Sequence, residues 1–211
     1  MTEITRTAEY NITIKENPSY EQTIINQIVD IHMKTFTGFF LTFLGKGFLK
    51  QLYKGFSSHE QSGLIVAEQK DSVVGFLAYS EDLSAFYRYL IKKSLLPFVW
   101  YSLGAAIRKP ASMIRLVRAF LKPGESKREE AYIELSSIGV LPQMKGHNIG
   151  SRLIDELKGK YDSNRFSYIK LETDADGNDG VNAFYMKNGF RIDHEYTTPE
   201  GRRMYEYRWS K

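Results

Sequence analysis

The sequence contains no cysteine among its 211 residues. Disulfides, thiolate metal sites and a cysteine nucleophile are therefore excluded. Histidine is scarce as well, and the four histidines, His32, His59, His147 and His194, lack the spacing of metal ligands. We therefore expect neither a sulfur-linked intermediate nor a resident metal.

Long apolar runs are also absent. The first ten residues, "MTEITRTAEY", have no apolar core of the kind found in secretory signals. The longest uncharged, apolar-rich run covers residues 94–107 and is interrupted by Pro97 and Gly104. A run of this length is too short to cross a bilayer as a helix. We expect a cytoplasmic protein that forms a single domain over residues 1–211, because the chain is 42% hydrophobic and of single-domain size.

Acidic residues are missing from one segment, residues 84–122. It carries eight cations: Arg88, Lys92, Lys93, Arg108, Lys109, Arg115, Arg118 and Lys122. The other 21 of the 29 cations are outnumbered by all 25 acids. The chain therefore combines a basic segment with a mildly acidic body.

Hydrophobic periodicity alternates between the strand and the helix pattern along the chain. Strand patterns cover residues 11–15, 63–69, 72–80, 131–140 and 167–174, with two more near 190–196 and 202–209. Helix patterns cover residues 20–36, 40–56, 149–160 and 179–188. The dipeptide Lys70-Asp71 predicts a hairpin turn, and prolines 97, 110 and 123 divide the basic segment into about three short helices.

The stretch "LPQMKGHNIG", residues 141–150, joins a predicted strand to a predicted helix. The first amides of a helix lack internal partners and its dipole is positive there, so such a turn can bind a phosphate. The spacing from Gly146 to Gly150 matches neither a Walker loop nor a dinucleotide-binding turn. Taken alone, the stretch also fits an ordinary strand-to-helix connection.

A second motif, "NDGVNAFYMKNGF", begins at Asn178 and ends in Asn188-Gly189-Phe190. Together the two motifs resemble those of the GNAT superfamily of N-acetyltransferases. The family turn, Gln/Arg-x-x-Gly-x-Gly/Ala, is matched by Gln143 and Gly146, with Asn148 as a departure. Asparagine adopts positive φ more readily than most residues, so the turn tolerates this exchange.

The resemblance implies an α+β fold: a central mixed, mostly antiparallel sheet of about seven strands, flanked by helices. Residues from about 83 to 130 exceed the family core, so we interpret them as a helical insertion. The resemblance also implies acetyl-CoA as co-substrate. The residues it implies for binding are Ile138, Gly139, Val140, Gln143, Lys145, Gly146, His147, Asn148, Ile149, Gly150, Ser151, Asn178 and Tyr185.

The implied reaction is direct acetyl transfer to a primary amine in a ternary complex. A carboxylate on a strand edge can take the proton of the amine. Glu134 is the first candidate for this base and Glu172 the second, although each also fits a surface glutamate on an alternating strand. Tyr185 is the candidate proton donor to the leaving thiolate, and the alternative is an aromatic residue of a buried helix face.

The acceptor is left open between alternatives. Residues 36–45, "FTGFFLTFLG", offer aromatic walls without acids, and Arg115, Arg118 and Lys122 share one helix face. An anionic small molecule such as a nucleotide-linked amino sugar fits these features, and the pattern resembles proteins of bacterial surface-polysaccharide clusters. A peptide amine is the second acceptor, and a non-catalytic acyl-CoA-binding module is the alternative of another class.

The basic face also fits contact with a membrane surface or a solvated cover of the domain. We expect no nucleic acid partner, because no docking motif is recognisable. We expect exposed aromatics near Trp100 and Trp209, which would suit a homodimer.

Overall fold

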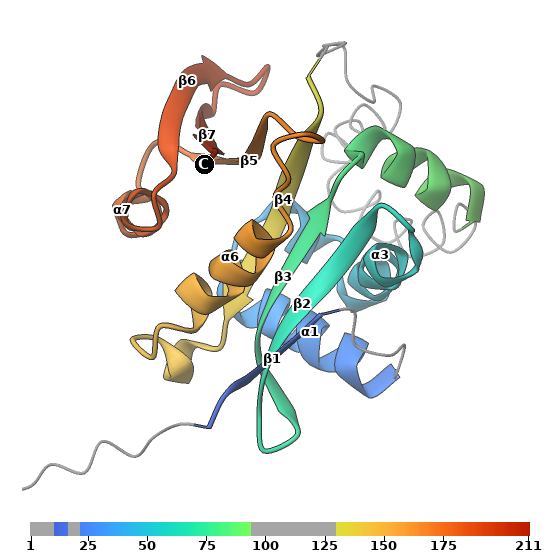
Figure 1. Ribbon diagram of the computed structural model, residues 1–211. Coiled ribbons are helices and arrows are strands. Elements are labelled where there is room, and N and C mark those ends of the chain that lie inside the picture. The colour runs from blue at the N-terminus through green and yellow to red at the C-terminus, as the bar shows by residue number, and fades with distance from the viewer. Residues whose placement is uncertain (1–10, 17–21, 94–129) are drawn as a thin grey trace, which may run out of the picture.

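The computed structural model describes residues 11–16, 22–93 and 130–211, and seven strands in this part of the chain form one sheet (Figure 1). Their order is β1-β2-β3-β4-β5-β7-β6. The bounds are β1 Thr13–Glu16, β2 Ser62–Gln69, β3 Ser72–Ser80, β4 Tyr132–Val140, β5 Tyr168–Asp174, β6 Arg191–Thr197 and β7 Arg203–Trp209. Only β4 and β5 pair in parallel; all other neighbours are antiparallel. The predicted mixed, mostly antiparallel sheet is confirmed.

Helices cover both faces of this sheet. They are α1 Gln22–Thr35, α2 Phe40–Phe43, α3 Lys46–Ser58, α6 Ile149–Gly159 and α7 Asp179–Lys187, with a further helix over 83–93. The helices α1 and α3 and the 83–93 helix share one apolar core with the sheet. The helix α6 packs on the opposite face in a second core, which also receives Tyr185 of α7. This layering is visible in Figure 1.

Strands β2 and β3 lie between these two cores, which explains their sequences. On β2, Leu64 and Val66 enter the core beneath α1 and α3, whereas Ile65 and Ala67 enter the core beneath α6. Successive side chains of a strand point to opposite faces, so a strand covered on both sides needs an uninterrupted apolar run. The turn between the strands has positive φ at both Lys70 and Asp71, as expected for a two-residue hairpin.

The helix pattern over residues 40–56 is broken in the structure. It divides into α2 and α3 at Gly45, where φ is 88°. A left-handed residue cannot continue a right-handed helix, and glycine adopts that conformation at little cost. Periodicity alone missed the break because Phe43, Phe48 and Leu49 keep an apolar face on both sides of it.

The predicted insertion is described only in part. Residues 83–93 form a helix whose Phe86 and Leu90 are buried in the core with α1 and α3. The remainder, including Trp100 and the predicted basic face with Arg115, Arg118 and Lys122, lies outside the described residues. Within the described ranges, no helix is both long and apolar enough to cross a membrane.

Candidate active site

Strands β4 and β5 stop pairing partway along their length. Their register runs from Tyr132 opposite Tyr168 to Glu134 opposite Lys170, yet β4 continues to Val140 and β5 to Asp174. Beyond Glu134, the β5 side of β4 therefore presents main-chain groups that no described strand pairs. The predicted binding stretch, Ile138 to Val140, lies on this unpaired part.

A bulge in β4 lies next to this separation. Tyr79 of β3 is opposite Leu135, whereas Ala78 is opposite Ser137, so Ser136 is an extra residue on β4. A bulge bends its strand and increases the local twist. The Oγ of Ser137 lies 3.3 Å from the hydroxyl of Tyr53 on α3, which connects the bulge to the helical layer.

The turn after β4 contains two residues with positive φ. A short 3-10 helix, Pro142–Met144, leads to Gly146 with φ of 87° and to Asn148 with φ of 57°. The predicted positive φ at Asn148 is confirmed. The amide of Arg152 donates to the carbonyl of Asn148 as α6 begins, so the amides of the first turn precede the helical bonds.

Two residues of this turn serve packing rather than an open surface. The Ile149 side chain is buried in the core beneath α6. A Cβ on Gly150 would lie 2.9 Å from the Phe184 ring, so glycine there allows α6 and α7 to approach. Gly146 differs, because no atom lies within 4 Å of the position of its Cβ. Gln143 and Lys145 are exposed beside it.

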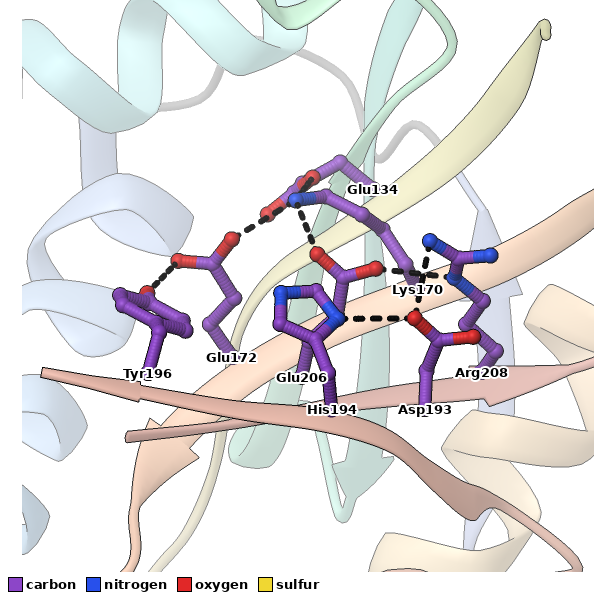
Figure 2. Close-up of polar contacts among 8 residues, drawn as sticks. All are labelled: Glu134, Lys170, Glu172, Asp193, His194, Tyr196, Glu206 and Arg208. Atoms are coloured by element: carbon purple, nitrogen blue, oxygen red, sulfur yellow. Dashed lines mark hydrogen bonds and ion pairs between the residues drawn. The ribbon is translucent and has the colours of Figure 1, made fainter. Parts of the chain in front are cut away.

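A buried lysine connects the two predicted candidates for the base (Figure 2). The Nζ of Lys170 on β5 lies 2.8 Å from Glu172 Oε1 and 3.2 Å from Glu134 Oε2. A third carboxylate, Glu206 on β7, has its Oε2 at 3.5 Å from the same ammonium. Although burial opposes its charge, the neighbouring carboxylates hold the pKa of Lys170 above its ordinary value.

The surroundings distinguish Glu134 from Glu172. Burial raises the pKa of Glu134 to about 7, although Lys170 opposes the rise. The Oε2 of Glu134 accepts no hydrogen bond of good geometry from the described residues, since Lys170 contacts it only as an ion pair. Both oxygens of Glu172 are occupied, because Oε1 accepts from Lys170 and Oε2 accepts from Tyr196 at 2.5 Å. The described residues therefore hold the Glu172 carboxylate by a hydrogen bond at each oxygen, whereas Glu134 Oε2 accepts none.

The outer end of this cluster contains a group with metal-ligand chemistry. Ligand atoms of Asp193, His194 and Glu206 lie within 4.8 Å of one another. Arg208 already binds two of them, because its guanidinium lies 3.0 Å from Asp193 Oδ2 and 2.8 Å from Glu206 Oε1. The Nδ1 of His194 also lies 2.8 Å from Asp193 Oδ2. Since the Arg208 guanidinium already occupies this position, we assign no metal to it.

Tyr185 lies on the opposite side of the sheet from Glu134. Its ring packs against Phe190 and Tyr207 in the core beneath α6. Burial raises the pKa of the Tyr185 phenol, so the hydroxyl is protonated at neutral pH. Ile133 and Leu135 of β4 enter this same core, which places Glu134 on the other face. A group that reaches both residues must lie where β4 and β5 separate.

Asn178 connects α7 to β5. Its side-chain amide donates to Thr173 Oγ1 at 2.8 Å and to the Asp174 carbonyl at 3.2 Å. The nearby Asn182 donates to the same carbonyl and accepts from Tyr207. The Asn178 side chain therefore fixes the start of α7 to the end of β5, and its predicted contact with the coenzyme stays a prediction.

Lys170, Glu206 and Arg208 were missed by the sequence reasoning. In β5, Tyr168, Lys170 and Glu172 alternate with Ile169 and Leu171. This alternation indicated that Lys170 and Glu172 share one face of the strand. Their meeting with β7 depends on a register between strands that are far apart in the sequence.

Trp209 also differs from expectation, because it is not an exposed aromatic. Its ring packs against Tyr161 at 5.3 Å and lies beneath Lys158 Nζ at 4.8 Å. The register of β7 beside β5 turns Trp209 toward α6. It therefore gives no support to the homodimer that we predicted from exposed aromatics.

Residues 25–190 match the sequence profile of the Acetyltransferase (GNAT) family. Among solved structures, the chain is similar to a GNAT-family protein from Desulfovibrio desulfuricans, with 13% identity, 94% of this chain and 98% of that one covered, and a TM-score of 0.61. Ard1 from Thermoplasma volcanium is 16% identical, with 94% and 96% covered and a TM-score of 0.57.

The ribosomal-protein-S18-alanine N-acetyltransferase from Escherichia coli is 13% identical, with 93% and 92% covered and a TM-score of 0.54. No curated protein matches the chain. At these identities the structural likeness concerns the fold, and the match over residues 25–190 concerns the family. The chain therefore belongs to the GNAT family of acetyltransferases.

Proposed function

We propose that this protein is an N-acetyltransferase that moves an acetyl group from acetyl-CoA to a primary amine by direct transfer. The observation that carries the proposal is the position of Glu134, whose buried carboxyl has a pKa of about 7. It forms the last β4–β5 pair before the strands separate. A base with a pKa near the working pH combines a large unprotonated fraction with useful proton affinity.

The turn at the start of α6 and the unpaired part of β4 are suited to hold acetyl-CoA. The open space at Gly146 lets an anion approach the main chain closely, and Lys145 adds positive charge. The main chain of Ile138 to Val140 would bond the pantetheine, and its amides would polarise the thioester carbonyl. His147, Asn148 and Ser151 belong to the same proposed site.

Each proton in the proposed reaction has a destination. Glu134 accepts the proton that the acceptor ammonium must lose, which leaves a neutral amine. The amine nitrogen then forms a bond to the thioester carbon, and the carbon–sulfur bond breaks. The departing thiolate gains a proton from the Tyr185 hydroxyl, and the second proton of the nitrogen passes through water to the phenolate that this leaves. Glu134 then releases its own proton to solvent when the products depart. No cysteine is present to carry the acetyl group between two steps.

The acceptor that we propose is a nucleotide-linked amino sugar. Its support is the basic segment, of which Arg88, Lys92 and Lys93 are exposed on the 83–93 helix. A peptide amine is the competing acceptor, and it is consistent with the same base and the same coenzyme. The proposed peripheral membrane contact rests on residues outside the described ranges, as does the part of the homodimer proposal that concerns Trp100, and each needs its own test.

The direct experiment follows thiol release from acetyl-CoA with a panel of amines: a nucleotide-linked amino sugar, a peptide N-terminus, a diamine and water alone. We expect release with the amino sugar and a loss of at least about 100-fold in kcat for Glu134→Gln. Glu60→Gln, an exposed change, serves as the matched control and should keep wild-type kcat.

The outcomes separate the alternatives. Thiol release with the peptide and with no other amine would show that the acceptor is a peptide and not an amino sugar. Binding of acetyl-CoA in calorimetry without release for any amine would favour a non-catalytic acyl-CoA-binding module. A wild-type rate in Glu134→Gln would remove Glu134 as the base.

A further inference from the structure

We propose that Lys170 and Glu206 act as an opposed pair that sets the protonation of Glu134, with Lys170 as the positioning residue of the base. This inference rests on the proposed function, because it takes Glu134 to be the proton acceptor. It assigns roles to two residues that would otherwise be regarded as a buried salt bridge.

The geometry places Lys170 at the branching point of the cluster (Figure 2). Its side chain is 7% exposed, and its Nζ faces Glu134 at 3.2 Å, Glu172 at 2.8 Å and Glu206 at 3.5 Å. One ammonium therefore forms ion pairs with three carboxylates. An opposite charge within about 4–6 Å lowers the pKa of a carboxyl, so Lys170 favours the ionised, proton-accepting form of Glu134.

Glu206 acts in the opposite direction. Its side chain is only 1% exposed, and its charge repels that of the buried Glu134 carboxylate. Arg208 limits this repulsion because its Nε donates to Glu206 Oε1 at 2.8 Å. The protonation of Glu134 thus reflects its burial, the attraction of Lys170 and the repulsion of two carboxylates, Glu172 and Glu206.

The remaining groups that face Glu134 come from three elements. Glu172 on β5 repels its charge, but Lys170 and the Tyr196 hydroxyl partly satisfy Glu172. Tyr87 of the 83–93 helix lies near both glutamates, and burial together with their charges raises its pKa to about 12. Tyr87 and Tyr196 are therefore neutral near pH 7 and do not titrate with Glu134.

Lys170 also positions the Glu134 carboxylate. The register pairs it with Glu134 at the last rung before β4 and β5 separate, and with Arg208 on the other side. The ammonium also lies 5.2 Å from the centre of the Tyr132 ring, which limits its movement. Lys170 therefore holds the Glu134 carboxylate at the edge of the separation, where an amine would arrive.

The test compares the pH dependence of kcat/KM for wild type, Lys170→Met and Glu206→Gln with one amine. We expect the acid limb to move up by about one pH unit in Lys170→Met and down by about half a unit in Glu206→Gln. Lys15→Met removes a lysine from an ion pair on β1 and is the matched control. Because the amine is the same throughout, its own ionisation cannot cause opposite shifts.

A second measurement keeps the test independent of turnover. The carboxyl carbons of 13C-labelled glutamate report the titration of Glu134 directly, with Glu134→Gln to assign the signal. We expect the same two opposite shifts there. Lys170→Gln replaces Lys170→Met if the methionine variant does not fold.

Equal Glu134 titration in wild type and both variants, or shifts of the same sign, would overturn this inference. That result would leave the proposed function intact wherever acetyl transfer persists. Loss of the proposed function would instead appear as wild-type protein that releases no thiol with any amine, whatever the titration of Glu134 shows.

Discussion

The Nδ1 of His32 on α1 lies 2.6 Å from the hydroxyl of Tyr53 on α3, and both side chains are buried in the core between the helices and the sheet. The same hydroxyl reaches Ser137 at the bulge of β4. Three polar groups from three elements therefore share one contact within an apolar layer. A buried polar group that loses its partner costs free energy, so this contact must stabilise the fold.

Tyr53→Phe should lower the free energy of unfolding by about 1–3 kcal/mol, because it leaves His32 Nδ1 and Ser137 without the hydroxyl. Urea denaturation monitored by circular dichroism measures the change. Tyr161→Phe is the control, since its hydroxyl donates to the Ser167 carbonyl at an exposed position and should cost little. Equal losses for the two variants would contradict the role of burial.

His32 should make the protein less stable at acid pH. Burial lowers the pKa of His32 to about 4, whereas the unfolded chain binds this proton near pH 6.5. The unfolded state therefore gains more protons as the pH falls from about 6.5 to about 4. The free energy of unfolding should drop by about 3 kcal/mol over this window from His32 alone.

The measurement is the free energy of unfolding at several pH values between 4 and 7 for wild type and His32→Gln. The variant should lose most of this acid dependence. His194→Gln, which changes an exposed histidine, should retain it. Parallel curves for wild type and His32→Gln would show that His32 does not carry the effect.

Two glycines of α6 should respond in opposite directions to alanine. Gly150→Ala places a Cβ 2.9 Å from the Phe184 ring and should cost about 1–3 kcal/mol, because α7 or the ring must shift. Gly159→Ala meets no atom within 4 Å and should gain about 0.5–1 kcal/mol from reduced freedom of the unfolded chain. Thermal unfolding of both variants tests the pair, and a loss in both would argue against it.

Gly146 should matter for the coenzyme more than for the fold. Gly146→Asp adds a negative charge beside the amides proposed to face the diphosphate, and we expect acetyl-CoA affinity to fall at least about tenfold. Gly201→Asp imposes the same side chain at a similar φ, 82° against 87°, in the turn between β6 and β7. Calorimetry should find near wild-type affinity in that control. Equal affinity in both variants would remove the turn from the binding site.

Tyr185→Phe should lower kcat by about 100-fold while acetyl-CoA affinity stays within about twofold of wild type. The removed hydroxyl is the proposed proton donor, and the ring that packs on Phe190 is retained. Tyr207→Phe, in the same aromatic group, loses its hydrogen bond to Asn182 and should affect stability rather than kcat. A weaker affinity with unchanged turnover in Tyr185→Phe would assign Tyr185 to binding instead.

The sequence by itself determined the order of the elements and the positive φ in the turn between β4 and α6. Alternation and helical spacing located the strands and most helices, because burial on one or two faces imposes those periods. The positive φ at Asn148 was predictable, since asparagine is one of the few residues other than glycine that adopt it readily. Glu134 was predictable as a candidate because the implied reaction needs a carboxylate on a strand edge, although Glu172 met the same criterion.

Only the tertiary structure decided what these residues meet. It ended the β4–β5 ladder at Glu134 and Lys170, and it brought Glu206 and Arg208 to them from the end of the chain. It also gave the predicted site residues different surroundings, because both oxygens of Glu172 accept hydrogen bonds and Gly150 packs against Phe184. Register and burial join residues that are distant in sequence, and the pKa of Glu134 depends on that shared environment rather than on its local neighbours.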